Sequence, residues 1–75
     1  MITTLVLLNN IENVNHFVAK MSEKDYDIDL SSGKYLVNGK SMMGVLSLDL
    51  TKPVTVIAET DDETFLEEID EYIVK

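Results

Sequence analysis

The sequence predicts a small α+β domain of two layers, with three amphipathic helices on one face of a four-stranded sheet. Three observations lead to this class: apolar runs of strand length, apolar residues at helical spacing between them, and turn residues at their boundaries. The element order is β-α-β-β-α-β-α. Residues 1–75 contain no linker, repeat or low-complexity segment, so we expect one domain.

The first half of the chain predicts a strand, a helix and a hairpin. Ile2 to Leu8 is an apolar, β-branched run of strand length. Asn9-Asn10 offers caps for the helix, and Tyr26 to Leu30 alternates apolar with acidic residues as a half-buried strand does. Ser31-Ser32-Gly33 then supplies a turn, and Lys34 to Asn38 is the returning strand. The residues expected on the apolar face of the helix are Ile11, Val14, Phe17, Val18 and Met21.

The second half predicts a short helix, a strand and a last helix. Ser41 is a natural N-cap for the short helix. Pro53 opens a strand that runs to Glu59, because a missing N–H is tolerated at a strand start. Thr60 or Asp61 is the expected cap of the last helix. Its apolar face is expected to comprise Phe65, Leu66, Ile69, Tyr72 and Ile73.

Composition excludes several classes of function. Fourteen acids face six lysines and no arginine, a net charge of −8, which disfavours nucleic-acid binding. The chain has no cysteine, no basic signal segment and no apolar run of membrane-spanning length, so we expect a cytoplasmic protein that does not enter membranes. The acids between Glu59 and Glu71 lack a calcium-loop pattern and are expected to form a solvated helix face. We find no nucleophile–base set and expect neither an enzyme nor a bound metal or cofactor.

The Ser41 helix is apolar on two sides. At about 100° per residue, Val45 and Leu48 point in one direction, while Met42, Met43 and Leu46 point in another. If the first pair faces the sheet, the second group points substantially towards solvent. Met42, Met43 and Leu46, called the methionine patch below, then suggest a docking surface, since methionine adapts to a partner. The residues alone equally allow a helix that packs deeply enough to bury them.

The segment Lys40-Ser41-Met42-Met43-Gly44 resembles the regulatory-serine motif of HPr, the phosphocarrier of the bacterial sugar phosphotransferase system. The resemblance covers most of the chain and is poorest from residue 8 to 16. It implies an open-faced sandwich with an antiparallel sheet of order 1-4-2-3. It also implies that the methionine patch docks partner proteins and that Ser41 is a phosphorylation site. A phosphate there would lie at a helix N-terminus, which favours anionic charge.

The same resemblance places Asn10 at the position of the phosphorylated histidine of HPr and Glu12 at that of its arginine. An amide does not accept a phosphoryl group as imidazole does, and a carboxylate repels phosphate. His16, the only histidine, is expected to be exposed in mid-helix, away from free backbone N–H groups. The phosphocarrier motif is therefore absent on this alignment.

Three functions follow as hypotheses. The first is a non-catalytic HPr-like regulatory protein, similar to catabolite-repression paralogues of HPr. Its partners would include HPr kinase, a transcriptional regulator or phosphotransferase components. The second is an active phosphocarrier that uses His16 or another residue. The third is a small interaction module without a link to sugar transport.

Overall fold

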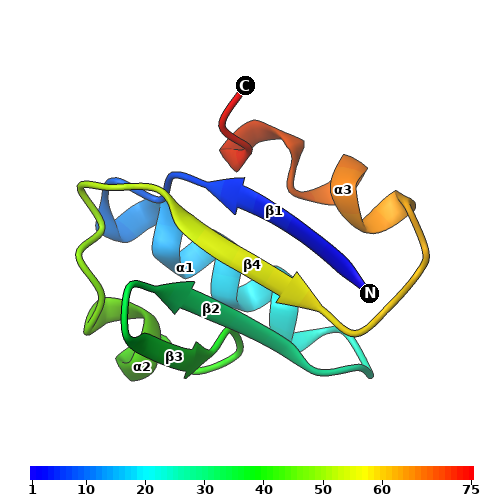
Figure 1. Cartoon of the computed structure of the whole chain (residues 1–75), viewed down its shortest axis with the longest axis horizontal. Coiled ribbons are helices and arrows are strands. Elements are labelled where there is room, and N and C mark those ends of the chain that lie inside the picture. Colours follow the sequence, from blue (N-terminus) through cyan, green and yellow to red (C-terminus); the bar gives the residue numbers. More distant parts are fainter.

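The computed structural model describes residues 1–75 and shows a four-stranded antiparallel sheet with helices packed against one face (Figure 1). The strands are β1 (Ile2–Val6), β2 (Ile28–Ser32), β3 (Tyr35–Asn38) and β4 (Val54–Ala58), and their order in the sheet is β1-β4-β2-β3. The helices are α1 (Ile11–Ser22), α2 (Met42–Leu46) and α3 (Thr64–Glu68), followed by the 3₁₀ turn η1 (Asp70–Tyr72). The predicted α+β class, element order and strand order are confirmed.

One apolar cluster of sixteen residues fills the space between sheet and helices. Alternation along the strands sends every second side chain into it, for example Val54, Val56 and Ala58 from β4. Helix α1 contributes Val14, Phe17, Val18 and Met21. Ile11, predicted on this face, is 60% exposed, so that assignment was wrong. It is the first residue of α1, and its side chain faces solvent rather than the sheet.

The β2–β3 hairpin is tighter than predicted. Ser32 pairs with Tyr35, which leaves only Gly33 and Lys34 in the turn, and β2 is shifted two residues along the chain from the expected Tyr26–Leu30. Gly33 has φ +58°, a left-handed conformation that two-residue hairpin turns require. Ser31 and Ser32, predicted in the turn, instead continue the strand.

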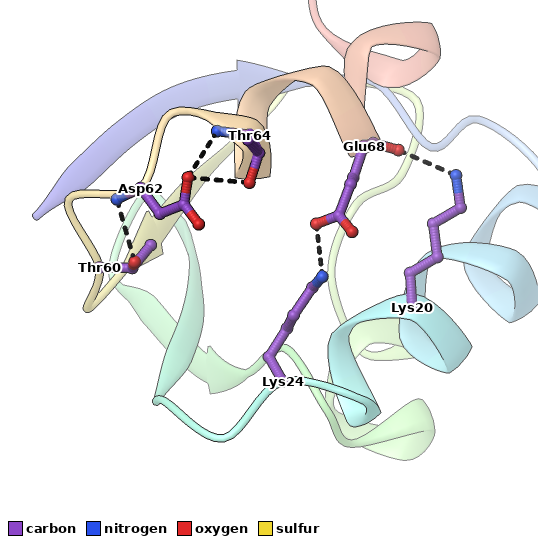
Figure 2. Close-up of polar contacts among 6 residues, drawn as sticks. All are labelled: Lys20, Lys24, Thr60, Asp62, Thr64 and Glu68. Atoms are coloured by element: carbon purple, nitrogen blue, oxygen red, sulfur yellow. Dashed lines mark hydrogen bonds and ion pairs between the residues drawn. The ribbon is translucent and has the colours of Figure 1, made fainter.

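The last helix is shorter than predicted. Its N-cap position is held by Glu63, without a capping side-chain hydrogen bond, and not by Thr60 or Asp61 as predicted. Just before the helix, Asp62 Oδ1 accepts from Thr64 N at 3.0 Å and from Thr64 Oγ1 at 2.8 Å (Figure 2). These hydrogen bonds lower the pKa of Asp62. After Glu68 the α-helix ends and the 3₁₀ turn η1 follows, and Ile73 then pairs with Val6 as an antiparallel bridge. The prediction of a single amphipathic helix up to Ile73 was therefore wrong, because the backbone adopts an extended conformation at Ile73 to pair with the edge of β1.

Two lysines, Lys20 in α1 and Lys24 just beyond its end, connect α3 to the rest of the molecule. Lys24 Nζ donates to a carboxylate oxygen of Glu68, and Lys20 Nζ donates to the Glu68 carbonyl oxygen at 2.9 Å (Figure 2). The hydrogen bond to Glu68 raises the pKa of Lys24. Beneath these contacts Tyr72 meets the ring of Phe17 edge-on, with centroids 5.8 Å apart. Polar contacts outside and an aromatic pair inside hold α3 and η1 on α1.

Candidate functional site: the Ser41 helix

Ser41 caps α2 as predicted from its sequence position. Its backbone is extended (φ −104°, ψ 111°), and its Oγ accepts a hydrogen bond from Gly44 N at 3.2 Å. The Ser41 N–H donates to the carbonyl oxygen of Asn38 at 3.0 Å, and the Asn38 side chain accepts from Lys40 N at 2.8 Å. The last residue of β3 thus fixes the short connection and sets the direction in which Ser41 enters the helix.

Gly44 gives this site its close packing, a role that the sequence reasoning missed. A Cβ at Gly44 would lie 3.3 Å from Ser41 Oγ and 3.3 Å from Val37 Cβ. These distances are tighter than ordinary van der Waals contacts, so the missing side chain lets α2 approach β3 and leaves the capping hydroxyl undisturbed. The glycine was noted only as part of a motif, because a helical glycine carries no local signal of what it touches.

Lys40 is held away from Ser41. Its Nζ donates to the carbonyl oxygen of Lys24 at 2.7 Å, just beyond the end of α1, where free carbonyl groups favour a cation. This contact ties the start of α2 to the end of α1. Asn10 lies at the start of α1, and no hydrogen bond joins it to Ser41.

The methionine patch is exposed in part. Met43 is 85% exposed and Leu46 is 41% exposed, whereas Met42 is half-buried and packs against the core. Val45 and Leu48 are buried, as their direction on the helix predicts. Helix α2 therefore uses one side for the core and leaves Met43 on the other with almost no contacts in the chain.

Asn10 acts as the N-cap of α1. Its Oδ1 accepts from Asn13 N at 2.8 Å, and the Asn13 amide in turn donates to Asn9 Oδ1 at 3.1 Å. Glu12 is exposed in the first turn, where a carboxylate suits the positive end of the helix. His16 is exposed further along α1, as predicted. Asn10 caps the N-terminus of α1, and the negative charge of Glu12 suits the same end of the helix.

Other surfaces offer little chemistry. No group of three or more histidine or acidic side chains is arranged to hold a metal ion. None of the helices has the length and apolar character needed to cross a bilayer. Some acids of the last quarter of the chain accept hydrogen bonds at the start of α3 or form ion pairs with lysines.

Comparison with known proteins defines the class to which this fold and the Ser41 helix belong. The model of the PTS-HPr family, described as "PTS HPr component phosphorylation site", matches residues 12–75. The chain therefore belongs to the HPr family and is related to the sugar phosphotransferase system. The matched range begins after Asn10, so it does not include the position that the sequence resemblance aligned with the phosphorylated histidine.

Solved structures agree with this assignment. HPr-C-His from Thermoanaerobacter tengcongensis is 27% identical with a TM-score of 0.76, covering 95% of this chain and 92% of its own. Crh of Bacillus subtilis, described as a catabolite repression containing protein that forms a swapped dimer, is 28% identical with a TM-score of 0.65, and the match covers 96% of this chain and 88% of Crh. The phosphocarrier protein HPr from Bacillus anthracis is 24% identical with a TM-score of 0.72, covering 97% and 96%, and supports the fold alone. No curated protein matches the sequence significantly.

Proposed function

We propose that this HPr-family protein is a non-catalytic regulatory protein that docks partner proteins through the methionine patch and is switched by phosphorylation of Ser41. The observation that carries the proposal is the 85% exposure of Met43, two residues after the capping serine. An exposed methionine beside Leu46 loses unfavourable contact with water when a partner covers it, and its flexible side chain adapts to the partner surface.

The switch would act through charge. A phosphoryl group on Ser41 Oγ adds a charge of about −1.5 to −2 beside an apolar docking surface. Helix α2 has only five residues, so its dipole contributes less to holding the phosphate than the sequence reasoning assumed. The main effect of phosphorylation is therefore on partner choice, because a dianion at the rim excludes some partners and attracts others.

The absence of phosphocarrier activity is part of the proposal. Asn10 Oδ1 is engaged in capping α1, and the exposed His16 has no arginine to assist it, since the chain contains none. The similarity to Crh supports a role in catabolite regulation. The expected partners are HPr kinase, a transcriptional regulator or phosphotransferase components, in the cytoplasm.

Incubation with ATP and an HPr kinase, followed by intact mass measurement, tests the docking and switching roles together. We expect wild type to gain one phosphoryl group and Ser41→Ala to gain none. Met43→Glu should be phosphorylated more slowly while its free energy of unfolding changes by no more than about 0.5 kcal/mol, as is usual for surface substitutions. Val45→Glu is the matched control on the same helix.

Val45 is fully buried, so a glutamate there should unfold a domain whose total stability is on the order of 5 kcal/mol. A Met43→Glu protein that unfolds like Val45→Glu would show that Met43 is structural. A wild-type protein that resists the kinase, or a phosphate located elsewhere, would contradict the switch at Ser41.

A further inference from the structure

The two edges of the sheet differ in how far they are covered. At the β1 edge, the C-terminal segment pairs with the strand: Val74 N donates to Leu5 O at 2.9 Å, and Leu7 N donates to Tyr72 O at 2.8 Å. At the other edge, β3 has β2 on one side and no strand beyond it (Figure 1). Helix α2 contacts β3 through Val37, on the core face, and so leaves the outer edge free.

The register shows which backbone groups β3 presents at this edge. Gly39 N donates to Ile28 O at 2.7 Å, and the pattern alternates along the strand, so Val37 and Tyr35 also direct their backbone N–H and C=O groups towards β2. The peptide groups of Leu36 and Asn38 therefore point outwards. The Asn38 carbonyl oxygen is taken by Ser41 N. This leaves the N–H and C=O of Leu36 and the N–H of Asn38 to pair with an added strand.

The side chains along this edge suit a partner that is apolar in part. Tyr35 is 70% exposed and Leu36 is 64% exposed, on opposite faces of the strand. Next to Tyr35 lies a depression of about 580 Å³ between the hairpin turn and the α2–β4 connection, and Lys34 and Lys52 belong to its lining. The one acid there, Asp49, accepts hydrogen bonds from Thr51, which lower its pKa. Neither Lys34 nor Lys52 forms an ion pair within the chain, so both ammonium groups remain available to a partner.

The distribution of charge along the chain indicates which kind of strand can pair with the β3 edge. Residues 28–58, which hold β2, β3, α2 and β4, have three lysines and two aspartates, a net charge of +1 in a chain of net −8, and one of these aspartates, Asp29, pairs with Asn38. Residues 59–75 hold eight acids and one lysine. A second copy pairing through its own β3 would bring the lysines that flank the two strands together and add two strongly acidic molecules. An acidic segment of another protein would instead be attracted by Lys34 and Lys52.

We propose that the β3 edge binds an extended, acidic segment of a partner protein, which adds as a fifth strand and directs carboxylates to Lys34 and Lys52. Main-chain hydrogen bonds to Leu36 and Asn38 supply affinity that is independent of the partner's sequence, and the two lysines select for acidic side chains. This surface is separate from the methionine patch and adds a second contact to the proposed function. A short strand flanked by lysines also discourages pairing with unsuitable strands, which sharpens the selection.

Titration of the ¹⁵N-labelled full chain with two blocked heptapeptides, one alternating valine with glutamate and one alternating valine with lysine, tests the proposal. We expect the acidic peptide to bind saturably, to shift the Leu36 and Asn38 amide signals most and to slow their hydrogen exchange. Its affinity should fall at least fivefold at high salt, because exposed charges attract it. The lysine peptide should bind at least tenfold more weakly.

Two variants locate the contact. Lys34→Glu combined with Lys52→Glu should weaken the acidic peptide at least tenfold without a lower thermal midpoint, since both lysines are exposed. Met43→Glu should leave this binding unchanged, which separates the edge from the methionine patch. Absence of binding, equal binding of the two peptides, or signal shifts centred on α2 or α3 would overturn the proposal.

Discussion

Tyr72 is the residue at which burial and chemistry conflict most. Its hydroxyl is buried without a hydrogen-bond partner, and burial raises its pKa from 10.0 to about 12. An unpaired buried hydroxyl costs folding free energy. Its ring, in contrast, packs on Phe17 and lies under the Lys20 ammonium at 5.8 Å. The ring is therefore structural, while the hydroxyl contributes nothing favourable inside the protein.

Tyr72→Phe tests this division. At neutral pH we expect unchanged or slightly higher stability, because the ring is kept and the unpaired hydroxyl is lost. In wild type the hydroxyl is neutral in both the folded and the unfolded state below pH 10, so stability there does not depend on its ionisation. As pH rises from 10 to 12 the unfolded side chain ionises before the buried one, and the free energy of unfolding falls by about 2 to 3 kcal/mol. The measurement is the free energy of unfolding against pH, and equal alkaline losses in the two proteins would contradict the assignment.

Asn10 is explained as a helix cap rather than as a reactive residue. Asn10→Ala removes the acceptor for Asn13 N and should lower the free energy of unfolding by about 1 kcal/mol. Asn10→Ser, which restores a capping oxygen, should recover most of the loss. Urea unfolding of the three proteins provides the comparison. An alanine variant as stable as wild type would show that the cap contributes nothing.

At the scale of elements, α3 depends on contacts with α1 more than on its own length. A helix of five residues is not stable alone, so the hydrogen bonds from Lys20 and Lys24 and the burial of Phe65 and Ile69 must hold it. We expect Lys24→Met to speed amide hydrogen exchange in α3 by up to about fivefold, since an ion pair that water still reaches contributes about 1 kcal/mol. Lys75→Met is the control, because the Lys75–Asp70 pair lies outside α3.

The Lys24–Glu68 ion pair should stabilise α3 only while Lys24 stays protonated. The pKa of Lys24 is raised, so its stabilising contribution is complete below the ordinary value of 10.5 and is lost as pH rises through the folded value. Exchange in α3 should therefore differ between wild type and Lys24→Met at neutral pH. Equal exchange in the two proteins there, or an equal effect of Lys75→Met, would show that the pair does not hold α3.

The elements also show what local sequence patterns predict and what they miss. Alternation along β4 and the period of Val14, Phe17 and Met21 in α1 identify buried faces, because each pattern is set within its own element. The early end of α3 has another origin. Ile73 lies on the helical face in sequence, yet it pairs with Val6, and no local pattern records a contact across that much chain.

The Ser41 site also has some features that local sequence predicts and others that depend on tertiary packing. The cap at Ser41 and the exposure of Met43 follow from position and helical direction. The half-burial of Met42, the contact of Gly44 with Val37 and the bond from Lys40 to Lys24 depend on how α2 sits against β3 and α1. Strand order was likewise implied by the family resemblance, since periodicity alone does not choose among antiparallel arrangements.

At the scale of the whole molecule, charge is segregated along the chain. The acids concentrate in the last quarter, and the segment containing β3 and α2 is the only one with net positive charge. The exposed Met43 and the free edge of β3 lie in that segment. Partners are therefore expected to approach this side of the protein, and the acidic side to keep the molecules apart in solution.

The central claim is that an HPr-family chain keeps the docking helix and its serine without relaying phosphate. Intact mass after incubation with phosphoenolpyruvate and Enzyme I tests it most directly, with an active HPr as the positive control and His16→Gln as the matched variant. The account predicts no added phosphoryl group on this chain while the control is modified. An acid-labile phosphate on wild type that disappears in His16→Gln would contradict it and show that the protein is a phosphocarrier.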